Sequence, residues 1–495
     1  MDQRTVLRLA AEVPDRDGFP LVDDLHARFA ALAAAHPDQV TVTRIGTSRL
    51  GEPLHSHRIG SGSHAAVVVG GVHPNEPIGS WTALHLATWL LEDPETAATL
   101  DTTWHIVPTI DPDGMRLNEA WFRDPHDRVH YARHFYRPAP DSQVEWTFPN
   151  SHGSVYFDRV LPETLAFMRL IDDTRPDLLV SLHNGEMGGV YYYLSEDLPD
   201  VIDTLRAVPA ALGLPLDTGE PESPHLRALA PAVFAMDGVE AAYDYLVSLG
   251  IDPAEHIHGG SSAAWAARHG TLCMVAELPY WSHPDADDQT PTDESYADLL
   301  RRSADDLAAS GAELRAVLDE ASPMLTIASP FLEASRAFVP MLAGIADTDR
   351  ARADHEPADR TATVAERFGC EDLVRCFRLR YGGMLLRALE VETTAGTAPA
   401  PLRRLRDQLA ERYAEWQADD LPDAAPIPIR TLVGVQFGAI LACASHVAGG
   451  DDSRHSAEPD RASPHRHGPS AAGASAGNRR RGPSPLLATS LTGGA

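Results

Sequence analysis

The chain has 495 residues, 43% of them hydrophobic and 23% charged, which is typical of a folded globular protein with room for two or three domains. Its formal net charge is −30, and all 41 basic residues are arginines. This balance argues against a nucleic-acid-binding protein, which normally carries a basic face, and against binding to anionic membranes.

We also expect no signal for export. The first residues of the chain show neither the basic start nor the apolar core of a signal peptide, and we expect no run to reach the roughly 20 apolar residues of a membrane span. The four cysteines are scattered and predict no disulfide framework. We therefore expect a cytoplasmic protein without a membrane or nucleic-acid partner. The sequence does not determine the oligomeric state.

The first 320 residues alternate segments of helix and strand character. The alternation predicts an α/β fold with a mixed, mostly parallel sheet and helices on both faces. A polar, aromatic stretch over 115–160 has little periodicity, and we interpret it as a long active-site loop region. Helices are predicted at 21–35, 78–91, 162–172, 201–212, 239–249 and 295–321, and strands at 40–45, 54–59, 65–69, 104–110, 178–182, 191–193 and 272–276.

Strand signals fade after residue 321. The composition there predicts a C-terminal all-helical region of roughly three to five helices, which would cover one side of the cleft or form an oligomer interface. Residues 449–495 are rich in Gly, Ser, Ala, Pro, Arg and His and are predicted to be disordered. We divide the chain into a catalytic domain over 1–320, a helical appendage over 321–448 and a low-complexity tail over 449–495. Helices are predicted at 331–345, 361–390, 400–416 and 429–447, the second interrupted by Gly369, Gly382 and Gly383.

The first candidate for chemistry is the segment 73–76, which reads His-Pro-Asn-Glu. It lies between the predicted strand at 65–69 and the predicted helix at 78–91. His73 and Glu76, three residues apart at a strand-to-helix turn, can converge on one metal ion. Imidazole nitrogen and carboxylate oxygen are both good Zn²⁺ ligands, and a catalytic zinc site needs three protein ligands and one open position. His-x-x-Glu by itself is a weak signal, and a solvated turn is the alternative.

Two further segments supply the remaining groups. His183 follows the predicted strand at 178–182, and Glu277 ends the apolar segment 272–276. A side chain just past the C-terminal end of a parallel strand faces the crevice in which open α/β sheets bind ligands. We interpret His73, Glu76 and His183 as the ligands of a hydrolytic zinc site. Glu277 is then the general base that takes the proton of the zinc-bound water and passes it to the leaving amine.

At this point the chain resembles the zinc carboxypeptidase family of metallopeptidases, over roughly residues 15–315. The resemblance implies a zinc carboxypeptidase-like fold, one zinc ion per chain and a peptide or amino-acid conjugate as substrate. The matching motifs, in the family's order, are the metal motif 73–76, the Asp-Pro-Asp-Gly turn 111–114, the third-ligand segment 181–184, the Gly-Gly-Ser loop 259–261 and the strand end 275–277.

The sequence departs from the family where substrate is recognised. Family members carry an Asp-x-Asn-Arg-Asn-Phe-Pro-like stretch, and the matching segment 144–149 reads Val-Glu-Trp-Thr-Phe-Pro. Glu145 can replace the Asp as the hydrogen-bond acceptor that orients His73. The Asn-Arg pair that grips a terminal carboxylate is missing, although a guanidinium is the natural bidentate partner of a carboxylate. The substrate-facing Tyr expected just before Gly259 is missing as well.

Nearby arginines are candidates to replace these groups. By its distance from the Asp-Pro-Asp-Gly turn, Arg123 best matches the family's oxyanion-stabilising arginine. Arg137, and after it Arg116, are candidates for binding an acidic group on the substrate. A loop arginine is more often solvated or in a weak surface pair, so the alternative for each is no catalytic role.

The sequence thus predicts a zinc-dependent hydrolase that cleaves an amide bond, a metallocarboxypeptidase acting on a peptide or an amino-acid conjugate. One alternative is an N-acyl amino-acid amidohydrolase or deacylase of the desuccinylase and aspartoacylase type. Another is an inactive, peptidase-like binding module. The sequence does not name the substrate.

Overall fold

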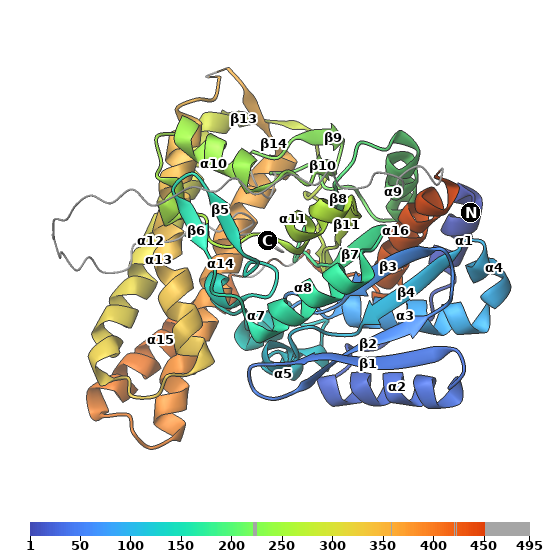
Figure 1. Cartoon of the computed structure of the whole chain (residues 1–495). Coiled ribbons are helices and arrows are strands. Elements are labelled where there is room, and N and C mark those ends of the chain that lie inside the picture. Colours follow the sequence, from blue (N-terminus) through green and yellow to red (C-terminus); the bar gives the residue numbers. More distant parts are fainter. Residues whose placement is uncertain (221–224, 358, 420, 422, 451–495) are drawn as a thin grey trace, which may run out of the picture.

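The computed structural model describes residues 1–220, 225–357, 359–419, 421 and 423–450, and Figure 1 shows its elements. All but two residues of the predicted tail, 449–495, lie outside this part of the chain. The strands of the main sheet are β1 (Val40–Thr47), β2 (Pro53–Ile59), β3 (His64–Val69), β4 (Thr102–Val107), β7 (Leu178–Leu182), β8 (Tyr191–Leu194), β9 (Ala228–Ala230), β10 (Val233–Ala235) and β11 (Leu272–Glu277). Short strands outside it are β5 (Asn150–His152), β6 (Val155–Phe157), β12 (Trp281–Ser282), β13 (Pro291–Ser295), β14 (Thr361–Thr363) and β15 (Ala425–Pro426).

The main sheet is mixed and runs in the order β1-β2-β4-β3-β7-β11-β8-β10-β9. Its centre, β4-β3-β7-β11, is parallel throughout, whereas β1, β2 and β9 join antiparallel and β8 is antiparallel to β11. This confirms the predicted fold class. The helices are α1 (Gln3–Ala11), α2 (Val22–Ala35), α3 (Ile78–Glu92), α4 (Pro94–Ala98), α5 (Pro112–Arg116), α6 (Glu119–Phe122), α7 (Arg128–His134), α8 (Pro162–Thr174), α9 (Pro199–Ala211), α10 (Val239–Ser248), α11 (Ser262–Ala266), α12 (Tyr296–Ala321), α13 (Pro330–Ala353), α14 (Val364–Thr394), α15 (Ala400–Ala418) and α16 (Ile429–Gly449).

Helices cover both faces of the sheet because successive strand residues point to opposite sides. Val67 and Val69 of β3 join a hydrophobic cluster that includes Phe167 of α8. The alternating residues Ala66 and Val68 point to the other face and join the cluster that includes residues of α3 and α16. A strand that is buried on both faces reads as a continuous apolar run, as β3 does.

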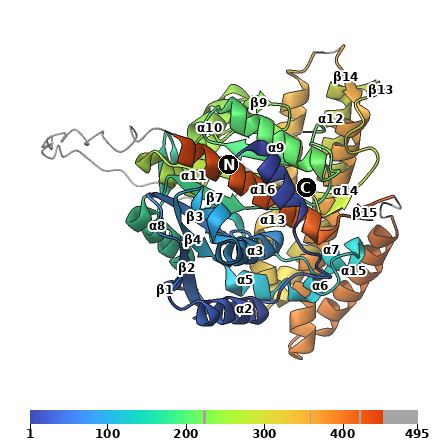
Figure 2. The ribbon, with the colours of Figure 1, turned by 90° about the vertical axis from the view of Figure 1, so that its right-hand side faces the viewer.

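The region from α12 onward is helical, but its helices do not all pack together. Helices α12, α13, α14 and α15 lie beside one another on one side of the sheet (Figure 1). Helix α16 instead returns to the sheet and packs against α1, α3 and α9, as Figure 2 also shows. Helix α16, which the predicted domain boundary at residue 320 assigns to the helical appendage, therefore packs with the elements around the sheet.

Helix α14 is continuous, so the predicted interruption at Gly369, Gly382 and Gly383 is wrong. The glycines allow close packing rather than breaking the helix. A Cβ on Gly382 would lie 2.9 Å from the Trp416 ring of α15, and one on Gly383 would lie 2.9 Å from the carbonyl oxygen of Ala132. Glycine costs helix stability, but here it lets neighbouring elements approach the helix axis.

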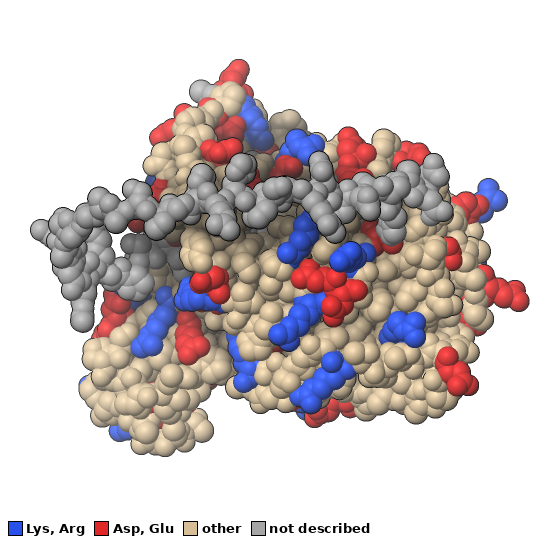
Figure 3. All heavy atoms as spheres, viewed as in Figure 1, with Lys and Arg blue, Asp and Glu red and all other residues tan. Residues whose placement is uncertain are grey.

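Helix α16 also corrects the expectation about apolar runs. By length and composition alone this 21-residue helix could cross a membrane. However, 72% of its most apolar window is buried inside the protein, as in the core helix of a soluble protein. The net charge does not produce a uniformly acidic surface either, because arginines are interspersed with Asp and Glu on the face seen in Figure 3.

A buried ionic network joins α14 to the region of the predicted active site. Arg128 of α7 donates to Glu186, which follows β7, at 3.0 Å, and to Asp372 of α14 at 2.7 Å. Arg380 of α14 forms a second ion pair with Glu186, and all four side chains are buried. Burial alone would raise the pKa of Glu186, but the guanidiniums of Arg380 and Arg128 hold it below its usual value.

Removing one partner of this network should be costly, because it leaves a buried charge uncompensated. We expect Arg380→Met to lower the free energy of unfolding by about 3–5 kcal/mol, measured by urea denaturation. The matched control is Arg412→Met, which removes an exposed arginine paired with Glu313 and Glu415. That change should cost about 1 kcal/mol or less. Equal losses in the two variants would contradict the assigned role of the network.

Candidate metal centre and active site

The candidate site lies where three neighbouring parallel strands end. In the sheet, β7 pairs with β3 on one side and β11 on the other, both in parallel. Their C-terminal ends therefore meet at the same edge of the sheet. His73 follows β3 after three residues, His183 directly follows β7, and Glu277 is the last residue of β11. Glu76 lies just before α3, in the loop that begins at His73.

The structure brings His73, Glu76 and His183 together. One potential ligand atom from each lies within 4.8 Å of the other two, and all three side chains are buried. Nδ1 of His73 is buried and has no hydrogen-bond partner among the described residues. In His183, Nε2 forms a 3.0 Å hydrogen bond with Ser181 Oγ, while Nδ1 faces Glu76 Oε2 at 3.4 Å. One nitrogen of each ring is thus directed toward a common point.

Glu76 is held by two donors that the sequence does not predict for it. Arg137 Nη1 donates to Glu76 Oε1 at 3.1 Å, and the Asn184 backbone N–H donates to Glu76 Oε2 at 3.2 Å. The Asn184 side chain also accepts a hydrogen bond from the N–H of Ile78, in the first turn of α3. Burial of a carboxylate is expensive unless charge and hydrogen bonds compensate it, and these contacts do so.

The surroundings favour the neutral form of His73. Burial, followed by the positive charges of Arg137 and His183, holds the pKa of the His73 imidazole well below its usual value, and a hydrogen bond with Gln143 opposes this only in part. Arg137 Nε in turn donates to Gln143 Oε1 at 3.0 Å. Neutral imidazole is the form that binds a metal ion, so the site is prepared for a cation.

Glu277 lies beside these groups. Its Oε1 is 3.5 Å from Nδ1 of His183, and its side chain is buried at the end of β11. The neighbouring strand β8 pairs Tyr191 with Glu277, which fixes the backbone of the carboxylate. Glu277 therefore faces the same point as the two histidines and Glu76.

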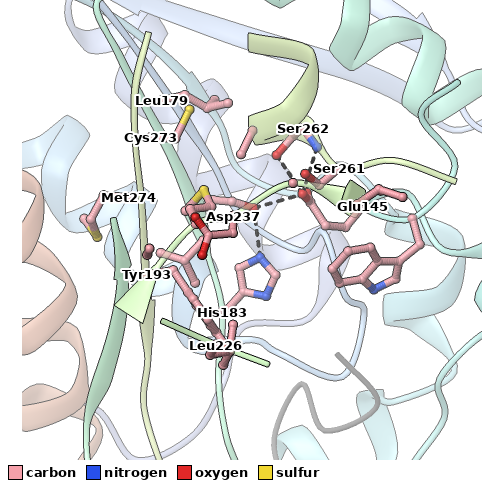
Figure 4. A pocket seen from close by; sticks show the side chains of 18 of the residues that line it. Glu145, Leu179, His183, Tyr193, Leu226, Asp237, Ser261, Ser262, Cys273 and Met274 are labelled. Carbon is pink, nitrogen blue, oxygen red and sulfur yellow. Dashed lines mark hydrogen bonds between the residues drawn. The ribbon is translucent and has the colours of Figure 1, made fainter. Parts of the chain in front are cut away.

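A cavity of about 960 Å³, including its solvent-open mouth, adjoins the site. Figure 4 shows several of its side chains, among them Glu145, His183, Asp237 and Ser262. Much of the wall is apolar, and among the described residues that line it none is an arginine. The apolar lining includes Leu179, Leu226, Ala235, Met236, Val239 and Met274.

Glu145 lies elsewhere than predicted. Its carboxylate accepts from the N–H and hydroxyl of Ser262 at 2.9 and 2.8 Å, and Ser181 Oγ lies 3.5 Å away. Ser181 in turn contacts His183, so Glu145 is connected to the second histidine rather than to His73 (Figure 4). Burial raises the pKa of Glu145 above its usual value, although His183 and Ser262 oppose the shift. Gln143 is the polar side chain at His73.

The three candidate arginines do not line the cavity. Arg123 is exposed at the end of α6, and Arg116 pairs with Glu52 and Asp23 near the surface. These positions do not support contact with substrate. Arg137 is buried against Glu76, so its charge is directed to a candidate metal ligand instead of to a substrate acid. Spacing along a loop could not reveal this, because short helices fold the predicted loop region 115–160.

Buried polar groups brace the loop that carries His73. Asn118 donates to the carbonyl of Pro74 at 3.2 Å, and Tyr280 donates to that of Asn75 at 2.8 Å. The Asp-Pro-Asp-Gly turn packs on the same loop, since a Cβ on Gly114 would lie 2.7 Å from Pro74. Asp111 caps α5 by accepting from the Gly114 N–H at 2.9 Å. Tyr280 and Asn118 are isolated polar residues in the sequence and carry no motif that would have identified them.

A comparison with models of protein families identifies the family to which the region around the sheet belongs. Residues 25–272, half of the chain, match the zinc carboxypeptidase (peptidase M14) family. The chain belongs to the zinc carboxypeptidase family. This membership supports a metallopeptidase-type hydrolase, and the buried His-Glu-His cluster agrees with the zinc dependence of the family. A search of curated protein sequences finds no match.

Solved structures of metallocarboxypeptidases are similar to part of the chain. Bovine thrombin-activatable fibrinolysis inhibitor, in complex with a tick carboxypeptidase inhibitor, is 12% identical, with 52% of this chain and 86% of that one covered and a TM-score of 0.36. A metallo-carboxypeptidase from Burkholderia cenocepacia is 18% identical (52% and 60% covered, TM-score 0.32). Carboxypeptidase A from Helicoverpa armigera is 17% identical (56% and 70% covered, TM-score 0.34). Similarity at this level carries no information about the substrate.

The turn at Asp111 gives a testable pH dependence. Burial raises the pKa of the Asp111 carboxyl to about 6, although Arg49 acts in the opposite direction. Because the folded state then binds the proton more tightly than the unfolded chain, the contribution of Asp111 to the free energy of unfolding is fully present at low pH. It is lost as the pH rises toward 6. We expect the stability of the protein relative to the Asp111→Asn variant to fall by up to about 3 kcal/mol between pH 4 and pH 7.

The measurement is the free energy of unfolding of both proteins across this pH range. Because Asn does not titrate, any constant difference in packing between the two proteins cancels in the slope. A difference that stays constant between pH 4 and pH 7 would contradict the prediction.

Proposed function

We propose that this member of the zinc carboxypeptidase family is a zinc-dependent hydrolase that cleaves an amide bond in a peptide or an amino-acid conjugate. The observation that carries the proposal is the buried convergence of His73, Glu76 and His183 within 4.8 Å, with Glu277 3.5 Å from His183. Two imidazoles and two carboxylates meeting at the edge of a cavity can hold a metal ion and move a proton, as metal-assisted hydrolysis needs.

The residues fit one zinc ion per chain. Nδ1 of His73 is buried without another partner among the described side chains, and two nitrogens with one carboxylate are a common catalytic donor set for zinc. His73, Glu76 and His183 would hold the ion. When bound, zinc supplies a Lewis acid that polarises the scissile carbonyl and makes a water molecule more acidic.

Glu277 is proposed as the group that moves the proton. Its carboxylate would accept a proton from the attacking water and donate it to the leaving amine. The position at the end of β11 supports this role, because the backbone is fixed by β7 on one side and β8 on the other. Because rigid strands hold the carboxylate near the reacting atoms, no conformational entropy has to be lost to position it at each turnover.

Arg137 is proposed to support the metal site instead of binding substrate. Its 3.1 Å contact with Glu76 and its 3.0 Å contact with Gln143 connect both halves of the His73–Glu76 motif. A buried cation here offsets the negative charge of the ligand set and orients Glu76. The oxyanion partner predicted at Arg123 has no support from that residue's exposed position.

The cavity supports a substrate with an apolar or uncharged group beside the scissile bond. Leu226, Met236 and Val239 give it an apolar wall, whereas its charged residues include the acidic Asp237 and Glu277. A negatively charged group of the substrate placed in this cavity would be repelled by these carboxylates.

The first test is metal content of the purified chain, measured by mass spectrometry. Wild type should hold about one zinc per chain, and the His73→Ala, His183→Ala double variant should hold almost none. Substitution of an exposed histidine, His126→Ala, is the matched control and should leave the metal content unchanged. Equal zinc in wild type and in the double variant would refute the proposed metal site.

Glu277→Gln then separates metal binding from chemistry. The variant should retain its zinc, while hydrolysis falls by roughly 10²–10⁴-fold because the proton acceptor is lost. An unchanged rate of hydrolysis would remove Glu277 from the mechanism. If the wild type binds zinc and hydrolyses no peptide or N-acyl amino acid, the proposed reaction itself fails.

The nature of the cavity predicts substrate preference. Among N-acylated dipeptides that differ only in the last residue, those ending in Leu or Met should be hydrolysed with a higher kcat/KM than those ending in Asp or Glu. The difference should be at least roughly tenfold, because a single uncompensated charge interaction is worth more than about 1.4 kcal/mol in a partly buried site. Faster hydrolysis of the acidic series would show that a cation outside the described cavity lining recognises the substrate.

A further inference from the structure

The C-terminal helix reaches the candidate metal centre through one buried side chain. Gln436 of α16 has no exposed surface, and its Nε2 donates a 2.8 Å hydrogen bond to the carbonyl oxygen of His183. Its Oε1 accepts a 2.6 Å hydrogen bond from the hydroxyl of Thr82 in α3. Gln436 therefore connects the helix after the first metal motif to the backbone of the second histidine. It lies 164 residues beyond the part of the chain that matches the family.

The atom that Gln436 binds belongs to a single rigid unit with the group that holds Glu76. The carbonyl of His183 and the N–H of Asn184 are the two ends of one peptide bond, which is planar. That N–H donates to Glu76 Oε2 at 3.2 Å. A force that orients the carbonyl oxygen therefore also orients the N–H, and with it one oxygen of a candidate metal ligand.

The surroundings leave Gln436 little freedom to move. Helix α16 approaches α1 so closely that a Cβ on Gly434 would lie 2.4 Å from the carbonyl oxygen of Ala10. The ring of Phe437 packs edge-on against His85 and Trp89 of α3, at centroid distances of 4.6 and 5.4 Å. The close approach to α1 at Gly434 thus fixes the depth of α16, so the amide of Gln436 is held in place before any ligand binds.

Resting on the proposed function, we propose that Gln436 is a positioning residue of the metal centre. By fixing the peptide between His183 and Asn184, it sets the direction of the His183 side chain and of the donor to Glu76. Groups outside the ligand set that orient the ligands commonly contribute roughly 10–100-fold to metal affinity. Helix α16 is accordingly a part of the active site, although no motif in its sequence indicates one.

The test compares two changes at adjacent positions of α16. Gln436→Met keeps the length and burial of the side chain but removes both amide groups. Phe437→Leu is the matched control, since it loosens the packing of α16 on α3 and leaves the amide intact. Affinity for Zn²⁺ is measured by competition with a chelator, and Co²⁺ is then added in place of Zn²⁺, because its visible absorption reports the arrangement of the ligands. Thermal unfolding shows how far each change destabilises the fold.

We expect Gln436→Met to weaken Zn²⁺ binding about tenfold and to shift the Co²⁺ absorption bands. Phe437→Leu should lower the melting temperature and leave Zn²⁺ affinity within about twofold of wild type, with an unchanged Co²⁺ spectrum, because the positioning amide remains. If Gln436→Met and wild type have equal Zn²⁺ affinities and equal Co²⁺ spectra, the inference is overturned, whereas the proposed function is unaffected. An equal loss of affinity in both variants would also overturn it, because packing of the helix would then explain the effect. Absence of metal binding in wild type would overturn the proposed function as well.

Gln436→Glu provides a second variant if Gln436→Met does not fold. A glutamate can still accept the Thr82 hydrogen bond, but when ionised it cannot donate to the His183 carbonyl. Measured at a pH above the pKa of the introduced carboxyl, which burial raises, it should show the same loss of Zn²⁺ affinity and the same change in the Co²⁺ spectrum. If neither variant folds while Phe437→Leu does, the inference is overturned, since Gln436 would then act in folding and not in placing the ligand.

Discussion

The convergence of three parallel strand ends is the constraint on which the site depends. Strands β3, β7 and β11 are neighbours in the sheet, so the segments that follow them must meet at one edge. His183 and Glu277 need only a position at the end of a strand to reach this edge. His73 and Glu76 need a tight turn as well, and Asn118 and Tyr280 hold that turn by its carbonyl groups. Backbone geometry thus determines which side chains can act together.

The helices after residue 321 take part in the architecture of the site in two ways. Helix α14 supplies Asp372 and Arg380 to the ionic network around Glu186, only three residues beyond His183. Helix α16 packs against α3 and supplies a buried amide to the backbone of His183 itself. Because buried charges and buried amides require partners, these contacts cannot be removed without cost to the elements they join.

The candidate ligands and the cavity draw on the same strand ends, but the cavity also draws on loops further along the chain. His73, His183 and Glu277 follow or end strands of the sheet, and hydrogen bonds hold Glu76 and His183. Leu179 of β7 and Met274 of β11 line the cavity, and loops add Leu226, before β9, and Asp237, after β10. Loops tolerate change without disturbing the sheet, so a cavity without the family's Asn-Arg pair is compatible with an intact set of candidate ligands.

The sequence alone predicted seven of the nine strands of the main sheet, most of the helices and the candidate metal-site residues, because each depends on local signals. Apolar runs of four to six residues mark buried strands, and His or Glu at their ends marks the edge where ligands bind. The roles of Arg137, Glu145 and Gln436 were decided only by the tertiary structure. Arg137 contacts a residue 61 positions away and Gln436 one that is 253 positions away. Such pairings follow from how distant elements pack, and no periodicity along the chain records them.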